Sequence, residues 1–122
     1  MILFRVVPPA KVPATGMGMP GSVSMYEMAV EATEMETQVG VKRARNQINT
    51  RRRQLEEAGV TARSEVVVGD PATMIKKFAK KEKVDLIVMT TRARRGIRRA
   101  LLGSVADDIV KSNVAPVLLL RR

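Results

Sequence analysis

Gly103 and Ser104 are the residues whose types and positions best suit a binding chemistry. They follow an apolar run at 84–89 and an arginine-rich stretch, and they open a helical pattern for which Ser104 is the predicted N-cap. Free N–H groups and the positive end of a helix dipole favour an anionic ligand such as phosphate. Nearby guanidinium groups pair well with phosphate oxygens. The arginines of this stretch are Arg92, Arg94, Arg95, Arg98 and Arg99.

Catalytic and metal chemistry find little support in the residue types. The chain has no cysteine and no histidine, which removes thiolate chemistry, the usual general base and the commonest metal ligand. Asp107 and Asp108 are adjacent carboxylates, but acids in the first turn of a helix are explained by the helix dipole. We therefore expect no enzyme activity and no metal site.

The composition bounds the class of protein. With 122 residues and 45% hydrophobic content, we expect one globular domain, 1–122. The net charge of +10 attracts anions, although a solvated basic surface explains it equally well. Aromatic content of 2% counts against base stacking, so nucleic acid is not the preferred partner. No apolar run reaches the roughly 18 residues of a membrane span, and no signal peptide is visible, so we expect a cytoplasmic protein without membrane contact.

Strand and helix patterns alternate along the chain. Such alternation predicts a parallel sheet with right-handed crossovers and helices on both faces. Residues 9–24 are rich in proline, glycine and methionine and read as a flexible loop. Gly40 is expected to kink or divide the first helix, and Gly59 to end it. The predicted strands are 2–7, 60–68, 84–89 and 117–120; the predicted helices are 24–58, 71–82 and a third that begins at Ser104 and ends by Asn113.

A stripe of methionines marks the first predicted helix. Met25, Met28, Ala32, Met35 and Val39 follow helical spacing. Methionine adapts to irregular surfaces, so the stripe indicates either adaptable core or contact with a partner helix, in preference to a cofactor site.

The C-terminal part of the chain resembles the universal stress protein family, whose ATP-binding members carry the motif G-x2-G-x9-G-[ST]. Gly103 and Ser104 match its last two positions, whereas Ala93 and Thr90 stand where the family has glycine. Arg94 matches a basic position that often follows the second glycine. The resemblance implies a flavodoxin-like, doubly wound α/β fold and a stress-response or regulatory role with ATP as ligand. The nucleotide-site residues that it implies are Val6, Val7, Thr90, Ala93, Arg94, Gly103, Ser104 and Val105.

Two departures from the family pattern predict a remnant site in which ATP binding is weak or lost. Ala93 adds a methyl group where backbone approaches phosphate, and Thr90 also replaces a glycine. In addition, the loop after residues 2–7 resembles the one that follows the family's second strand. On this interpretation the chain has four strands and lacks the family's first strand and helix. The acidic residue that faces adenine, at the end of that first strand, is then also missing. The alternative, that residues 2–7 are the first strand, fits the proline-rich loop less well.

The C-terminal strand is the predicted dimer interface. Val117, Leu118, Leu119 and Leu120 are apolar on both faces and lie at a sheet edge, which is a template for pairing. Universal stress proteins pair their last strands in this way, so the resemblance implies a homodimer. The alternative function is a basic nucleic-acid-associated protein.

Overall fold

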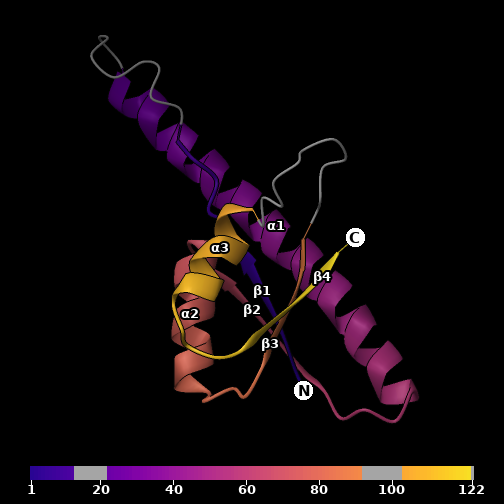
Figure 1. Ribbon diagram of the computed structural model, residues 1–122. Helices are drawn as coiled ribbons and strands as arrows, with labels where there is room; N and C mark the ends of the chain where they lie inside the picture. The colour runs from indigo at the N-terminus through magenta and orange to yellow at the C-terminus, as the bar shows by residue number, and fades with distance from the viewer. Residues whose placement is uncertain (13–21, 92–102, 122) are drawn as a thin grey trace. The chain divides into compact units, whose positions relative to one another are not determined.

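The computed structural model describes residues 1–12, 22–91 and 103–121. The chain divides into two compact units, Met1–Asp70 and Pro71–Arg122. The elements, in order, are β1 (Ile2–Val7), α1 (Ser22–Glu57), β2 (Arg63–Val68), α2 (Pro71–Lys81), β3 (Ile87–Thr91), α3 (Ser104–Lys111) and β4 (Val117–Arg121) (Figure 1).

The four strands are all paired in parallel. β1 pairs with β2 in the first unit and β3 pairs with β4 in the second, which gives two two-stranded sheets. The prediction of an α/β fold with four parallel strands is therefore confirmed.

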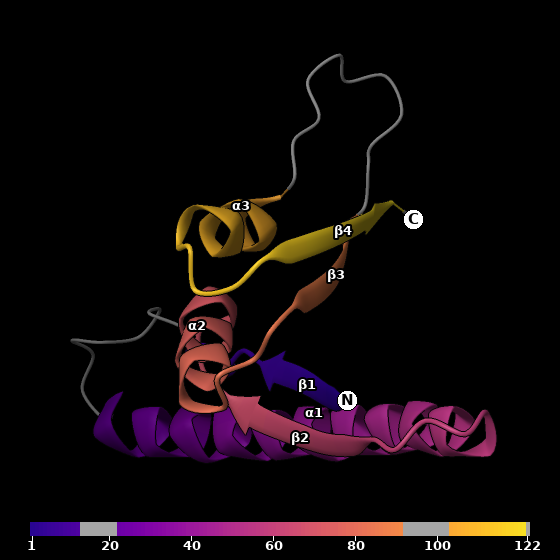
Figure 2. The same cartoon turned by 60° about the horizontal axis from the view of Figure 1, so that its bottom comes forward.

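In the first unit, α1 packs along both strands (Figure 2). Ala44 and Ile48 of α1 are buried, as is Ala62 just before β2. The small side chain of Ala44 lets the helix approach the strands closely, and Ile48 supplies apolar area to the same contact. The core of this unit therefore lies between the central part of α1 and the β1–β2 sheet.

Gly40 does not divide the first helix, contrary to the prediction. α1 is continuous from Ser22 to Glu57. A Cβ atom at Gly40 would lie 3.4 Å from Cγ1 of Val7, so the absence of a side chain serves the approach of the helix to the end of β1. The glycine is explained by packing, although glycine in a helix interior costs about 1 kcal/mol relative to alanine.

α1 ends at a glycine, as the sequence predicts. The N–H of Gly59 donates to the carbonyl of Glu56 and that of Val60 to Leu55, at 3.0 and 2.9 Å. This pair of bonds is the Schellman motif, with Gly59 in a positive-φ conformation. The bond made by Val60 also explains why β2 begins at Arg63 and not at residue 60.

In the second unit, α2 and α3 pack against each other, and Ala72, Ala79, Ala106 and Ile109 are buried. β3 begins three residues later than predicted, because the N–H of Val84 donates to the carbonyl of Ala79 at the end of α2. One face of this strand is exposed in its unit. Val88 is 56% exposed, and Leu118, its register partner in β4, is 47% exposed.

Candidate functional site

The start of α3 forms the most distinctive polar site among the predicted residues. Gly103 occupies the N-cap position with φ 79° and ψ 154°, and no side chain caps the helix. The prediction of Ser104 as N-cap is therefore wrong: Ser104 is the first helical residue. The difference has a local cause, because the extended, positive-φ conformation that leads into this helix is open to glycine and strained for serine.

The backbone at this helix start presents N–H donors. The bond from the Asp107 N–H to the Gly103 carbonyl, 3.0 Å long, belongs to the first turn of the helix. The N–H groups of Ser104, Val105 and Ala106 precede it and have no intrahelical acceptor. Both Gly103 and Ser104 are exposed, so an anion can approach the donors at the end of the helix.

The acidic residues of α3 affect this site electrostatically. Asp107 forms an ion pair with Lys111, with 2.8 Å between Oδ2 and Nζ. The hydrogen bond and the charge of Asp107 raise the pKa of Lys111 above its ordinary value, and the charge of Asp108 adds to this. The ammonium group of Lys111 thereby offsets part of the negative charge in the first turn, which would otherwise oppose an anion.

The predicted nucleotide-site residues are distributed over both units. Gly103, Ser104 and Val105 lie together at the start of α3, and Thr90 lies exposed in β3 of the same unit. Val6 and Val7 end β1 in the other unit. Ala93 and Arg94 lie outside the described residues, as do the remaining arginines of residues 92–99.

The outer edge of β4 is the predicted dimer interface. The N–H of Ile87 donates to the carbonyl of Pro116 at 2.8 Å. With the observed register, the alternation of a parallel ladder directs the N–H groups of Leu118 and Leu120 toward β3 and that of Leu119 away from it. The side chains of Leu118 and Leu120 are exposed on one face of the sheet.

The methionine stripe, for which the sequence left adaptable core and contact with a partner helix open, is not part of the core of its unit. Met25, Met28, Ala32, Met35 and Val39 are all exposed on α1. Their spacing is visible in the sequence, but their exposure depends on which face of α1 packs on the strands.

Across residues 1–12, 22–91 and 103–121, no cluster of three or more acidic or other ligating side chains is suited to a metal ion. In those same ranges, no helix combines the length and the apolar content that crossing a membrane requires.

A model of the universal stress protein family matches residues 1–121, nearly the full length of the chain. The chain belongs to this family. Universal stress protein MJ0531 of Methanocaldococcus jannaschii is 37% identical over 106 residues, covering 87% of this chain and 58% of that protein. Universal stress protein MJ0577 of the same organism is 34% identical over 79 residues, covering 65% and 49%.

The solved structure of MJ0577 supports the same assignment. It matches this universal stress protein with a TM-score of 0.68 at 27% identity, over 99% of this chain and 74% of that one. The matches to MJ0531 and MJ0577 extend over only about half of those relatives.

Proposed function

We propose that this universal stress protein is a cytoplasmic regulatory protein that binds the phosphates of an adenine nucleotide weakly at the start of α3. The observation that carries the proposal is the exposed and uncapped helix start at Gly103 and Ser104, which coincides with the last two positions of the family's ATP motif. Backbone N–H groups and the helix dipole supply attraction to phosphate without any cationic side chain.

Weak affinity follows from the residues that replace the motif glycines. Thr90 and Ala93 carry side chains where the family has none, and no acidic residue is assigned to the adenine. Each lost contact worth about 1.4 kcal/mol weakens ATP binding about tenfold, and we expect a dissociation constant for ATP of roughly 0.1 mM or weaker.

Isothermal titration of the protein with ATP tests the proposal. We expect the parent to bind ATP with a dissociation constant near or above about 0.1 mM. Ser104→Asp should abolish this binding, because it places a carboxylate beside the phosphate. Ser104→Ala is the matched control, because it keeps the backbone N–H and should retain binding. Equal ATP binding by Ser104→Asp and the parent would contradict the site, and a sub-micromolar constant would contradict the weak-binding proposal.

We also propose that the protein does not hydrolyse the nucleotide. The chain offers no histidine as a general base, and α3 supplies donors that bind a phosphate without activating a water molecule. Phosphate release from ATP should match a protein-free control over several hours. Release that exceeds the control and is lost in Ser104→Asp would overturn this proposal.

The outer edge of β4 is the proposed interface of a homodimer. Within its sheet, β4 has β3 as its one strand neighbour, and the N–H of Leu119 is directed away from that neighbour. Two β4 strands paired antiparallel about a two-fold axis would satisfy these outward groups in both copies. Arg121 ends the strand and limits the growth of the pairing.

Analytical ultracentrifugation tests the dimer. The parent should sediment as a dimer at about 50 µM, as expected for a micromolar association. Leu119→Pro removes an outward donor and should shift the protein toward monomer. Leu118→Pro removes an inward donor, so it should lower stability while the remaining folded protein still associates. A parent that is monomeric at this concentration would refute the interface.

A further inference from the structure

The N-terminal half of α1 carries an exposed apolar stripe, here called the methionine face: Met25, Met28, Ala32, Met35 and Val39. The exposed fractions of the three methionines are 72%, 68% and 72%, and that of Val39 is 58%. The intervals of three, four, three and four residues repeat the a and d spacing of a heptad. At 1.5 Å per residue the face is about 21 Å long, or two full heptads.

The methionine face plays no part in the packing of its own unit. The side of α1 that faces the strands contains Thr37, Ala44 and Ile48, and the hydroxyl oxygen of Thr37 accepts a hydrogen bond from the Ala10 N–H at 3.1 Å. Met35 and Thr37 are two residues apart and thus about 200° apart around the helix. The apolar stripe therefore lies opposite the face that packs on the sheet, where nothing in the fold of this unit requires it.

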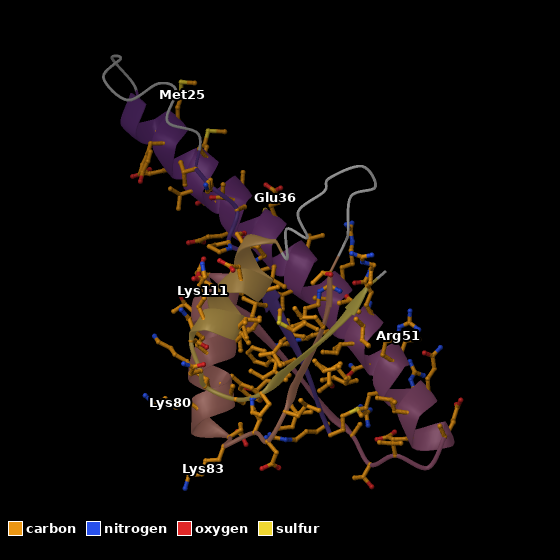
Figure 3. The ribbon with its side chains drawn as sticks, viewed as in Figure 1. Met25, Glu36, Arg51, Lys80, Lys83 and Lys111 are labelled. Carbon is orange, nitrogen blue, oxygen red and sulfur yellow. The ribbon has the colours of Figure 1, made fainter. Side chains whose placement is uncertain are left out.

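The charges that flank the methionine face are all negative. Residues 22–41 contain Glu27, Glu31, Glu34 and Glu36 and neither lysine nor arginine, in a chain whose net charge is +10. Within the described part of the chain, these four carboxylates form no ion pair. Figure 3 shows Met25 and Glu36 on the N-terminal half of this helix and Arg51 toward its C-terminal end.

An open cavity adjoins the methionine face on one side. Pro9 and Ala10 form one wall, and Glu31, Glu34 and Met35 lie on the other. The cavity brings two carboxylates to the border of the apolar stripe, so a cationic side chain entering it from a bound partner would meet both.

We propose that this surface docks an amphipathic helix of a partner protein that has apolar residues at heptad spacing and lysine or arginine on its flanks. The apolar stripe of the partner covers the methionine face, and one of its basic side chains enters the cavity beside Glu31 and Glu34. Methionine suits this task because its flexible side chain adapts to different apolar surfaces. A second copy of α1 suits the surface poorly, because it would bring eight glutamates together at the interface.

Binding of designed helical peptides tests the proposal directly. The probe is an 18-residue peptide with leucine at heptad a and d positions and lysine or arginine at e and g, labelled for fluorescence anisotropy. Two matched peptides carry glutamate at e and g, or the same composition with the heptad scrambled. We expect micromolar binding of the basic peptide and at least about tenfold weaker binding of both controls. The net charge of +10 disfavours nonspecific binding of a basic peptide to the rest of the protein.

Variants of the protein locate the binding. Met28→Gln with Met35→Gln should weaken binding of the basic peptide about tenfold or more, because both methionine side chains lose apolar contact with it. Glu31→Gln with Glu34→Gln should weaken it about threefold to tenfold and reduce its salt dependence. Glu57→Gln, which neutralises one exposed carboxylate at the other end of α1, is the control and should leave the affinity unchanged. All these side chains are exposed, so helix content by circular dichroism should stay constant.

Three outcomes would overturn the proposal. The first is equal affinity for the basic and acidic peptides, and the second is unchanged affinity in the double methionine variant. The third is a different occupant for the same face. Dissociation of a parent dimer by the double methionine variant would identify a second copy, and methionine-dependent binding to anionic lipid vesicles would identify a membrane surface.

Discussion

The two units each contain a β-α-β segment, and the two segments differ most in the length of their helix. In β1–α1–β2, a helix of 36 residues, about 54 Å long, connects strands of six residues, about 20 Å long. In β3–α3–β4, a helix of eight residues, about 12 Å, connects strands of five residues, about 17 Å. The N-terminal part of α1 extends past its strands (Figure 1), whereas α3 is shorter than its strands.

This difference in length decides which part of each helix is available for binding. A helix much longer than its strands has turns whose outer side contributes nothing to the sheet contact, and in α1 that side carries the methionine face. A short helix offers little side surface, but its first turn presents free N–H groups. We therefore expect the side of α1 to bind a protein partner and the end of α3 to bind an anion.

The largest expected effect contrasts the two sides of α1. Ala44→Asp buries an unpaired carboxylate at a position that is 2% exposed, and should lower the free energy of unfolding by about 3 kcal/mol or more. Met35→Asp places a carboxylate on the opposite side of α1 and should change the free energy of unfolding by less than about 0.5 kcal/mol. Urea denaturation monitored by circular dichroism measures both. Comparable losses would mean that the methionine face is part of the core.

A smaller effect should separate two neighbouring residues of α3. Ile109 is 1% exposed, so Ile109→Ala should cost about 2–4 kcal/mol by removing buried methyl groups. Val110 is 39% exposed, and Val110→Ala should cost less than about 1 kcal/mol. The same denaturation experiment measures both changes, and a larger loss for Val110 would show that α3 packs through a different side.

Local signals in the sequence predicted most of the secondary structure. Proline at position 71 and glycine at position 59 placed a helix start and a helix end correctly. The two misplaced strand starts have a common cause, because Val60 and Val84 were assigned to strands for their apolar, β-branched side chains. Both residues instead donate the closing hydrogen bond of the preceding helix, which depends on the backbone conformation one residue earlier.

The start of α3 was more predictable than the methionine face, because it depends on local sequence and not on packing between distant elements. The start of α3 is encoded within a few residues, so Gly103 and Ser104 were found from the sequence, although the N-cap is Gly103 and not Ser104 as predicted. The exposure of the methionine face depends on packing between α1 and strands that are far away in sequence. A periodic apolar pattern alone predicts burial and partner contact equally well.

Helix ends in the two units provide a stabilising change of intermediate size. α2 ends with the same pair of hydrogen bonds as α1, but Lys83, with φ 49°, stands where α1 has Gly59. Lys83→Gly should raise the free energy of unfolding by about 0.5–1 kcal/mol, because glycine adopts positive φ without strain. The reciprocal change, Gly59→Ala, should lower it by about 1 kcal/mol. A loss of stability in Lys83→Gly would show that the lysine side chain makes a contact worth more than the strain.

The smallest expected effect concerns the pKa of Lys111, at the opposite end of α3 from the proposed anion site. Its hydrogen bond with Asp107 and the charge of that residue raise this pKa, so Asp107→Asn should lower it toward the ordinary value. Asp108→Asn should lower it less, because Asp108 contributes only a weaker charge effect. Nuclear magnetic resonance titration of the lysine side chain measures both shifts.

Because the folded-state pKa is raised, the pair stabilises the protein below the ordinary lysine pKa of about 10.4, and this contribution is lost as the pH rises through the higher folded value. The parent should therefore lose slightly more stability than Asp107→Asn in that alkaline range. If Asp107→Asn also strengthens phosphate binding, the carboxylate in the first turn opposes the anion, as expected for a site at the end of this helix. Identical phosphate binding in both proteins would place the anion away from the first turn of α3.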